Sequence, residues 1–180
     1  MSATLIINRW TGAAGSPTKT NITSINTRVN AYDGHSTNGT TSPVAIPASM
    51  GQNNSFWCVT QLHCSVAPAT LVNNIKWFPL DSSNPWTGVT MVVNTATSYI
   101  QATGTVGTSG TILTTGNYST LAGTPVSAFT YNSGSPLSVA GSTSTTGDFG
   151  DFVVYQFQVQ DNASAGAIAQ EVVSWQYDEL

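Results

Sequence analysis

The sequence is poor in charge, and this limits the partners that it can bind. Charged residues make up 7% of the 180 residues, with four Lys or Arg, eight Asp or Glu and a formal net charge of −4, whereas about 25% is usual for a globular domain. The four fixed cations, Arg9, Lys19, Arg28 and Lys76, are scattered along the chain. Nucleic-acid binding depends on a basic patch or stripe, so we expect no direct contact with DNA or RNA.

Long apolar runs are also missing. The sequence contains no stretch of about eighteen apolar residues, which a transmembrane helix requires. The first nine residues have neither the basic leader nor the long apolar segment of a signal peptide. We therefore expect no membrane segment, and synthesis in the cytoplasm of the producing cell.

Cysteine is limited to Cys58 and Cys64. In an extended strand a six-residue separation spans about 20 Å, whereas a disulfide tolerates about 6 Å between Cα atoms. We therefore expect two free thiols on one side of a strand. Cysteine and histidine are the usual ligands of zinc, and His63 lies next to Cys64. However, His63 and Cys64 would point to opposite faces of the strand, and a fourth ligand is missing, so we expect no zinc site.

Histidine is equally scarce, and the sequence indicates no catalytic site. His35 lies between Asp33 and Ser36, but side chains so close together in a glycine turn do not reach the geometry of a Ser-His-Asp triad. The His-x-His pair of metal-binding cupins is absent. A glycosidase needs two carboxylates across a cleft, which eight acidic residues could supply but which no pattern here indicates. We expect a protein that is not an enzyme and has no cofactor.

Asp148 and Asp151 lie three residues apart in a glycine-containing stretch. Their carboxylates could supply oxygen ligands to Ca²⁺ from a loop. The alternative, which we favour, is a turn that begins a strand.

What the sequence does contain is a two-residue alternation of apolar and polar side chains. Val153, Tyr155, Phe157 and Val159 alternate with glutamines, which is the pattern of a half-buried β-strand. The pattern returns in residues 173–177 after a turn-rich stretch, so we expect the two segments to form an antiparallel pair.

Similar patterns predict further strands, which we place at residues 4–10, 22–32, 55–64, 71–78 and 89–93, with a short edge segment at 43–47. Residues 104–116 and 133–147 are rich in Gly, Ser and Thr and are expected to form long loops.

Turn signals about every dozen residues are typical of an all-β sandwich. We predict one antiparallel domain over residues 1–180, with jelly-roll or related Greek-key topology and little or no helix. An open immunoglobulin-like sandwich is the alternative. The predicted core comprises Ile25, Val29, Leu62, Ile75, Trp77, Val89, Met91, Val93, Tyr155, Phe157, Val159, Val173 and Trp175.

Several stretches resemble small virion structural proteins of tailed bacteriophages, namely residues 8–12 (NRWTG), 55–57 (SFW), 74–77 (NIKW), 147–156 (GDFGDFVVYQ) and 174–179 (SWQYDE). The resemblance implies a head-decoration or cement protein, a β-sandwich subunit that binds the outside of the capsid, often as a trimer, and clamps the major capsid protein. Residues 1–20 are the stretch that could serve as the extended arm of some cement proteins.

Two alternatives to decoration remain from the sequence. A receptor- or glycan-binding module of a fibre or adhesin would expose aromatic side chains on loops, and Trp86 with Tyr118 or Tyr131 could form such a cluster. A self-assembling shell or filament subunit would build particles unaided.

Overall fold

The computed structural model describes residues 2–180 and consists almost entirely of antiparallel β-sheet. Strands account for 41% of the chain and helix for 2%, and the only helical element among the described residues is the short 3₁₀ turn η1 (Ala128–Thr130). The all-β prediction is therefore confirmed. No helix in the described part of the chain is long and apolar enough to span a membrane.

The larger sheet contains seven strands, and its central strand is β11 (Gly147–Gln160). One side of β11 pairs with β4 (Cys58–Val66) and β3 (Gln52–Asn54), and the other pairs with β6 (Val89–Ala96). The sheet continues beyond β4 and β6 to its two edges, with β1 (Thr4–Thr11), β2 (Thr18–Asn21) and β9 (Val126–Ser127).

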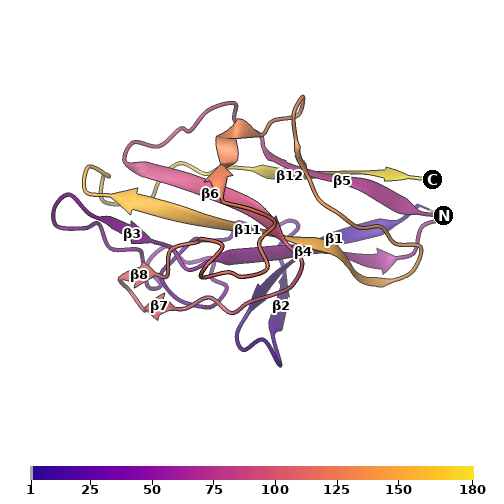
Figure 1. The fold of residues 1–180 in the computed structure, drawn as a ribbon, viewed down its shortest axis with the longest axis horizontal. Coiled ribbons are helices and arrows are strands. Elements are labelled where there is room, and N and C mark those ends of the chain that lie inside the picture. The colour runs from indigo at the N-terminus through magenta and orange to yellow at the C-terminus, as the bar shows by residue number, and fades with distance from the viewer. Residues whose placement is uncertain (1) are drawn as a thin grey trace.

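The smaller sheet has three strands in the order β10 (Leu137–Ser138), β5 (Val72–Pro79) and β12 (Val173–Glu179). A separate two-stranded ribbon is formed by β7 (Gly104–Thr105) and β8 (Ser109–Gly110). Figure 1 shows β5 and β12 side by side along one side of the molecule, with both chain ends close together. The backbone N–H of Ala3 donates a hydrogen bond to Glu179 Oε1 at 2.6 Å.

The larger sheet is buried on both faces. Tyr155 and Phe157 of β11 point into an inner core that includes Trp77 of the smaller sheet. Phe152 and Val154, at alternate positions of the same strand, point into an outer core covered by loops. A strand buried on both faces loses the strict polar alternation of a half-exposed strand, as β11 does from Phe152 to Phe157.

The predicted pairing of residues 151–160 with 173–177 is wrong. Both edges of β11 are occupied by strands of the larger sheet, and β12 pairs with β5 instead. Residues 161–172 therefore cross from one sheet to the other rather than closing a hairpin. The alternation indicated correctly that both segments are strands, but alternation carries no information on which strands are neighbours.

The predicted strand at residues 22–32 is also wrong, because the strand in this region is β2 and it ends at Asn21. The Asn21 side chain accepts a hydrogen bond from Thr23 N at 3.0 Å, which turns the chain away from the sheet. Ile25, placed in the core from the sequence, is 45% exposed. The segment at 43–47 also forms no strand.

The remaining predicted core residues do lie in or against the inner core. Val29, Val159, Val173 and Trp175 are partly buried, and those that are fully buried are Leu62, Ile75, Trp77, Val89, Met91, Val93, Tyr155 and Phe157. The antiparallel sandwich is thus confirmed, whereas jelly-roll connectivity stays a prediction.

Candidate functional site

A cavity of about 890 Å³ lies on the inner face of the larger sheet. We call it the inter-sheet cavity. The smaller sheet has only three strands and leaves part of this face uncovered. The strands β1, β4, β6 and β11 contribute lining side chains such as Ile7, Thr60, Met91, Tyr155 and Phe157. Three segments without regular secondary structure, residues 22–29, 39–46 and 163–172, contribute further lining residues, as do Trp86 and, from β12, Val173 and Trp175.

The composition of residues 163–169 (ASAGAIA) explains why the space is not filled. Close packing between sheets requires large apolar side chains, and this segment offers mainly Ala, Ser and Gly. Trp86 Nε1 donates a hydrogen bond to the Ala169 carbonyl at 2.9 Å. Gln170 Nε2 donates to Asn26 Oδ1 at 3.0 Å and so joins residues 163–172 to residues 22–29.

Arg9 does not itself line this cavity, but it contacts two residues that do, and it carries a buried positive charge. The residue is 1% exposed, and its Nη1 donates hydrogen bonds to Thr27 Oγ1 at 3.1 Å and to the Arg28 carbonyl at 3.0 Å. Thr27 and Arg28 both line the cavity. Arg9 Nε is shielded from solvent and has no hydrogen-bond partner, and no ion pair joins Arg9 to an acidic side chain within residues 2–180.

The charge of Arg9 influences the titratable groups around it. Burial lowers the pKa of His35, and the nearby Arg9 guanidinium lowers it further. Burial raises the pKa of Cys58 and of Tyr155, and in both cases Arg9 opposes the change. Arg9 therefore acts as a positive centre without an anionic partner in this part of the inner core.

Glu171 is the acidic residue that lines the cavity. Its Oε1 accepts a hydrogen bond from Asp81 N at 3.2 Å, whereas its Oε2 is buried without a partner. Burial raises the pKa of the Glu171 carboxyl. Glu171 follows Gln170, which bonds to Asn26, and lies two residues from Ala169, which bonds to Trp86.

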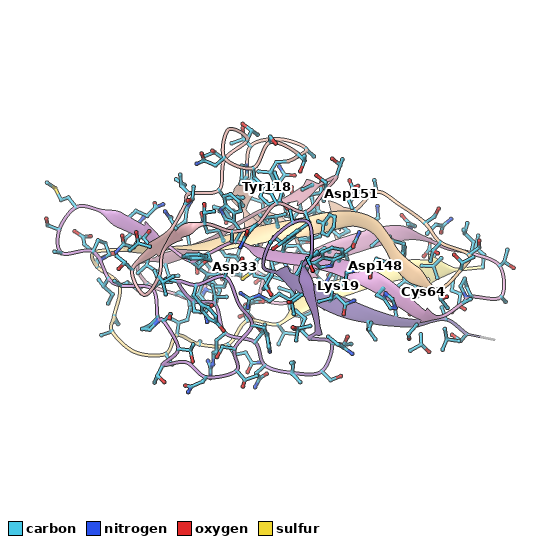
Figure 2. The ribbon with its side chains drawn as sticks, turned by 90° about the horizontal axis from the view of Figure 1, so that it is seen from below. Lys19, Asp33, Cys64, Tyr118, Asp148 and Asp151 are labelled. Atoms are coloured by element: carbon cyan, nitrogen blue, oxygen red, sulfur yellow. The ribbon has the colours of Figure 1, made fainter. Side chains whose placement is uncertain are left out.

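The structure places Asp148 in a small cluster of basic side chains rather than in an open loop. Its Oδ2 accepts a hydrogen bond from Lys19 Nζ at 2.5 Å, and Figure 2 shows these two residues next to each other. Its Oδ1 lies 2.7 Å from His63 Nδ1. Burial raises the pKa of Asp148, but the hydrogen bonds from Lys19 and His63 outweigh it, so the net pKa is lowered. Asp151 is not part of this cluster, and burial raises its pKa. Because basic side chains occupy both Asp148 oxygens, the arrangement disfavours Ca²⁺ binding there.

The two cysteines are free and buried, and both pack in the inner core, as expected from their positions in one strand. His63 Nδ1 lies 2.7 Å from Asp148 Oδ1 across the β4–β11 pair, so His63 is engaged by the sheet itself. Among the described residues, no three His, Cys, Asp or Glu side chains are grouped so that they could hold a metal ion.

His35 is also separated from the neighbours that suggested a triad. Its Nδ1 lies 3.2 Å from Thr27 Oγ1. The Asp33 carboxylate instead accepts hydrogen bonds from Gly12 N at 2.9 Å and from Gln101 Nε2 at 2.8 Å.

The aromatic cluster considered for glycan binding is not exposed. Trp86 is 8% exposed and packs on Phe157 in the inner core, with ring centroids 5.0 Å apart. Tyr118 is fully buried in the outer core, where its hydroxyl donates to the Ser98 carbonyl at 3.0 Å. Tyr131 is partly buried against the inner core. Trp86 and Tyr118 thus lie on opposite faces of the larger sheet.

The sequence contains a signal for the burial of Arg9. Leu5 and Ile7 precede it at alternate positions of β1, and both pack against the inner core. Alternation therefore directs Arg9 inward. An arginine at an inward position requires hydrogen-bond acceptors around it. The sequence therefore predicts polar groups within the core near the end of β1.

Comparison of the chain with protein-family models, with curated proteins and with solved structures gives no match in any of the three.

Proposed function

We propose that this chain is a virion structural subunit that is not an enzyme. It binds the outer capsid surface as a homo-oligomer, most simply a trimer, and stabilises the shell by adding contacts between major capsid protein subunits. The observation that supports this most directly is the free edge of β12. This strand ends the three-stranded sheet, and its outer edge pairs with no other described strand.

An unpaired edge strand is a template for pairing with another chain, and proteins that avoid such pairing place Lys or Pro there or cover the edge. β12 contains neither Lys nor Pro. Exposed apolar side chains lie on and around it, with Val172 at 49%, Tyr177 at 38% and Leu180 at 63% exposed. Addition of a partner strand would use the free backbone groups for affinity and these side chains for specificity.

The acidic residues of β12, Asp178 and Glu179, lie at its C-terminal end, so residues 173–177 present an uncharged edge. Asn74 Nδ2 donates a hydrogen bond to Asp178 Oδ2 at 2.8 Å. Glu179 accepts hydrogen bonds from Ser2 Oγ at 2.8 Å and from Ala3 N. With little charge elsewhere on the chain, contacts with a partner would rest on apolar area and neutral hydrogen bonds, and would change little with salt.

The test measures capsid stability in particles from which the protein has been removed. Adding back the wild-type chain is expected to raise the rupture temperature at both low and high salt. A ligand that binds only the intact lattice stabilises it by about 2.7 kcal/mol per site at a hundredfold excess over Kd. Unchanged rupture temperature in both buffers, or a monomeric chain that fails to rebind, would refute the proposal.

A pair of matched variants tests the role of the β12 edge. Val172→Lys with Tyr177→Lys places two charges beside this edge, and should abolish rebinding. Val106→Lys with Val126→Lys places the same charges at exposed sites elsewhere in the chain, and should rebind like wild type. If both pairs of substitutions reduced rebinding to the capsid equally, added charge rather than the β12 edge would be the cause. Electron microscopy of the chain alone tests the shell or filament alternative.

A further inference from the structure

We infer that the β12 edge and the inter-sheet cavity form one binding site for an extended segment of a partner protein. The backbone of the segment pairs with β12, and its alternate side chains, which are apolar, enter the cavity. This site rests on the β12 contact of the proposed function, and it adds the sequence pattern that the partner needs.

The ladder between β5 and β12 shows which backbone groups of β12 are free. Leu80 N donates a hydrogen bond to the Val172 carbonyl at 2.8 Å, and hydrogen-bonded positions alternate along an antiparallel pair. At the intervening positions, Val173 and Trp175 therefore direct their N–H and C=O groups to the free edge. The pairing of Val173 with Pro79, which has no N–H, agrees with this pattern. A row of free N–H and C=O groups at strand spacing is the chemistry that recognises an extended peptide.

The inter-sheet cavity lies on the free side of β12. Val173 and Trp175 of β12 contribute to its lining, whereas no described residue of β5 or β10 does. The two residues whose backbone groups face the free edge thus also line the cavity. Directly opposed residues of neighbouring strands have their side chains on the same face. A strand added beside β12 would therefore point every second side chain toward the inner face of the larger sheet, where the cavity lies.

The cavity suits the side chains on one face of a single strand. Its volume of about 890 Å³ falls in the range of sites that enclose small molecules, about 300–1,000 Å³, and is too small for a folded partner. Phe157 and Val159 form part of its apolar wall. Arg28 and Glu171 are the charged residues among those that line it, and they have opposite signs. Residues 173–177 carry no charge, so the complementary segment is uncharged and apolar at alternate positions.

Exposed apolar side chains gather at the rim of the cavity. Ile25, Ile46, Ile168 and Val172 all line it and are 36–49% exposed. Apolar surface gathered in this way marks an interaction site, and its removal from water is favourable. Val172 directly precedes β12, so the rim and the free edge are continuous and a single partner segment covers both.

The test uses the full chain and two synthetic heptapeptides with blocked ends, and follows binding by calorimetry. The peptide SVTVTVS is uncharged and carries three valines on one face when extended, whereas SSTSTSS has the same backbone without them. The valine peptide should bind one per chain and at least about tenfold more tightly than the serine peptide, as expected when valine side chains are buried. Equal affinities, or a chain that pairs with itself and takes up no peptide, would overturn the inference.

Hydrogen exchange and one pair of variants locate the peptide. Its addition should slow exchange of the Val173 and Trp175 amides at least about tenfold, because both face the free edge. Ile168→Asp places a charge in the wall of the cavity and should weaken binding of the valine peptide at least about tenfold. Ile112→Asp makes the same change at a residue of similar exposure outside the cavity, 42% against 39%, and should bind like wild type. Unchanged exchange at both amides, or equal binding by both variants, would refute the site.

Capsid rebinding separates failure of this site from failure of the proposed function. If the valine peptide binds as described but the chain does not restore capsid stability, the partner strand does not come from the capsid, and only the proposed function fails. If Ile168→Asp rebinds capsids like wild type although Val172→Lys with Tyr177→Lys does not, the β12 edge holds the partner without the cavity, and the inference fails while the proposed function stands.

Discussion

Replacement of Gln156 by Leu should destabilise the protein, although it exchanges a polar residue for an apolar one of similar size in the centre of a sheet. Gln156 is fully buried in β11. Its Nε2 donates hydrogen bonds to the carbonyls of Ser55 at 2.7 Å and Thr111 at 2.8 Å. Its Oε1 accepts a hydrogen bond from Leu113 N at 2.7 Å. One side chain therefore joins β11 to two loop segments of the outer layer.

The magnitude follows from the groups that the substitution leaves without a partner. The Leu113 N–H and the Ser55 carbonyl lose the bonds described above, whereas the Thr111 carbonyl keeps its hydrogen bond from Trp57 Nε1 at 2.8 Å. Each buried group without a partner costs about 1–3 kcal/mol, and burial of a leucine side chain returns about 1.5–3 kcal/mol. With central values, Gln156→Leu lowers the free energy of unfolding by about 2 kcal/mol.

The assay is urea denaturation of Gln156→Leu beside the control Gln158→Leu, followed by both tryptophan fluorescence and far-UV circular dichroism. Gln158 is on the same strand but only half-buried, and its described hydrogen bond is a single one of 3.3 Å with Thr90 Oγ1. The control should change stability by no more than about 0.5 kcal/mol. The midpoint should fall for Gln156→Leu with little change in the slope m. A Gln156→Leu protein as stable as wild type would refute the argument that these hydrogen bonds hold the outer layer on the sheet.

Three further predictions concern thiols, pH and backbone packing. Alkylation in denaturant without reductant should modify both Cys58 and Cys64, and intact mass should show two adducts per chain; a molecule with none would contain a bridge that contradicts the structure. Because the folded-state pKa of Asp148 is lowered, its stabilising contribution should be present above about pH 4 and be lost as pH falls through the lowered value. Asp148→Asn should remove this part of the acid dependence of urea unfolding, so an unchanged profile would contradict the role of the cluster. Gly110→Ala would place a Cβ 2.3 Å from a backbone carbonyl oxygen and should cost at least about 1–3 kcal/mol, whereas Gly15→Ala, whose Cβ would have no neighbour within 4 Å, should unfold like wild type in the same thermal scan.

The sequence by itself determined the six long strands, β1, β4, β5, β6, β11 and β12, and most of the inner core. Residues that alternate along β5, β6 and β11 point to a common face because of the geometry of an extended chain, which depends on nothing beyond the strand itself. For the same reason the positions of Cys58 and Cys64 in one strand predicted two thiols on one face. The expectations that the protein binds no nucleic acid and is not an enzyme came from composition, namely from the low charge and the scarcity of histidine and cysteine.

The sequence could not predict the candidate site, because each of its parts depends on long-range packing. Arg9 becomes a buried charge without an ion pair only because residues 22–29 pack over β1 with hydroxyl and carbonyl groups and no carboxylate. The cavity exists because residues 163–169 carry small side chains where the smaller sheet ends. The alternation in residues 22–29 wrongly predicted a strand, and residues 163–169 have no periodic pattern, so neither segment's sequence indicated its place.

Only the tertiary structure decided which strands are neighbours and what covers the second face of the larger sheet. Residues 151–160 and 173–177 are close in sequence but belong to different sheets, because β4, β3 and β6 already occupy both edges of β11. Gln156 stands at a polar position of an alternating strand, yet it is fully buried because loops 40 or more residues away supply its hydrogen-bond partners. Alternation specifies the two faces of a strand, whereas the edges and the covering layer are set by contacts between distant segments, which leave no periodic mark on the sequence.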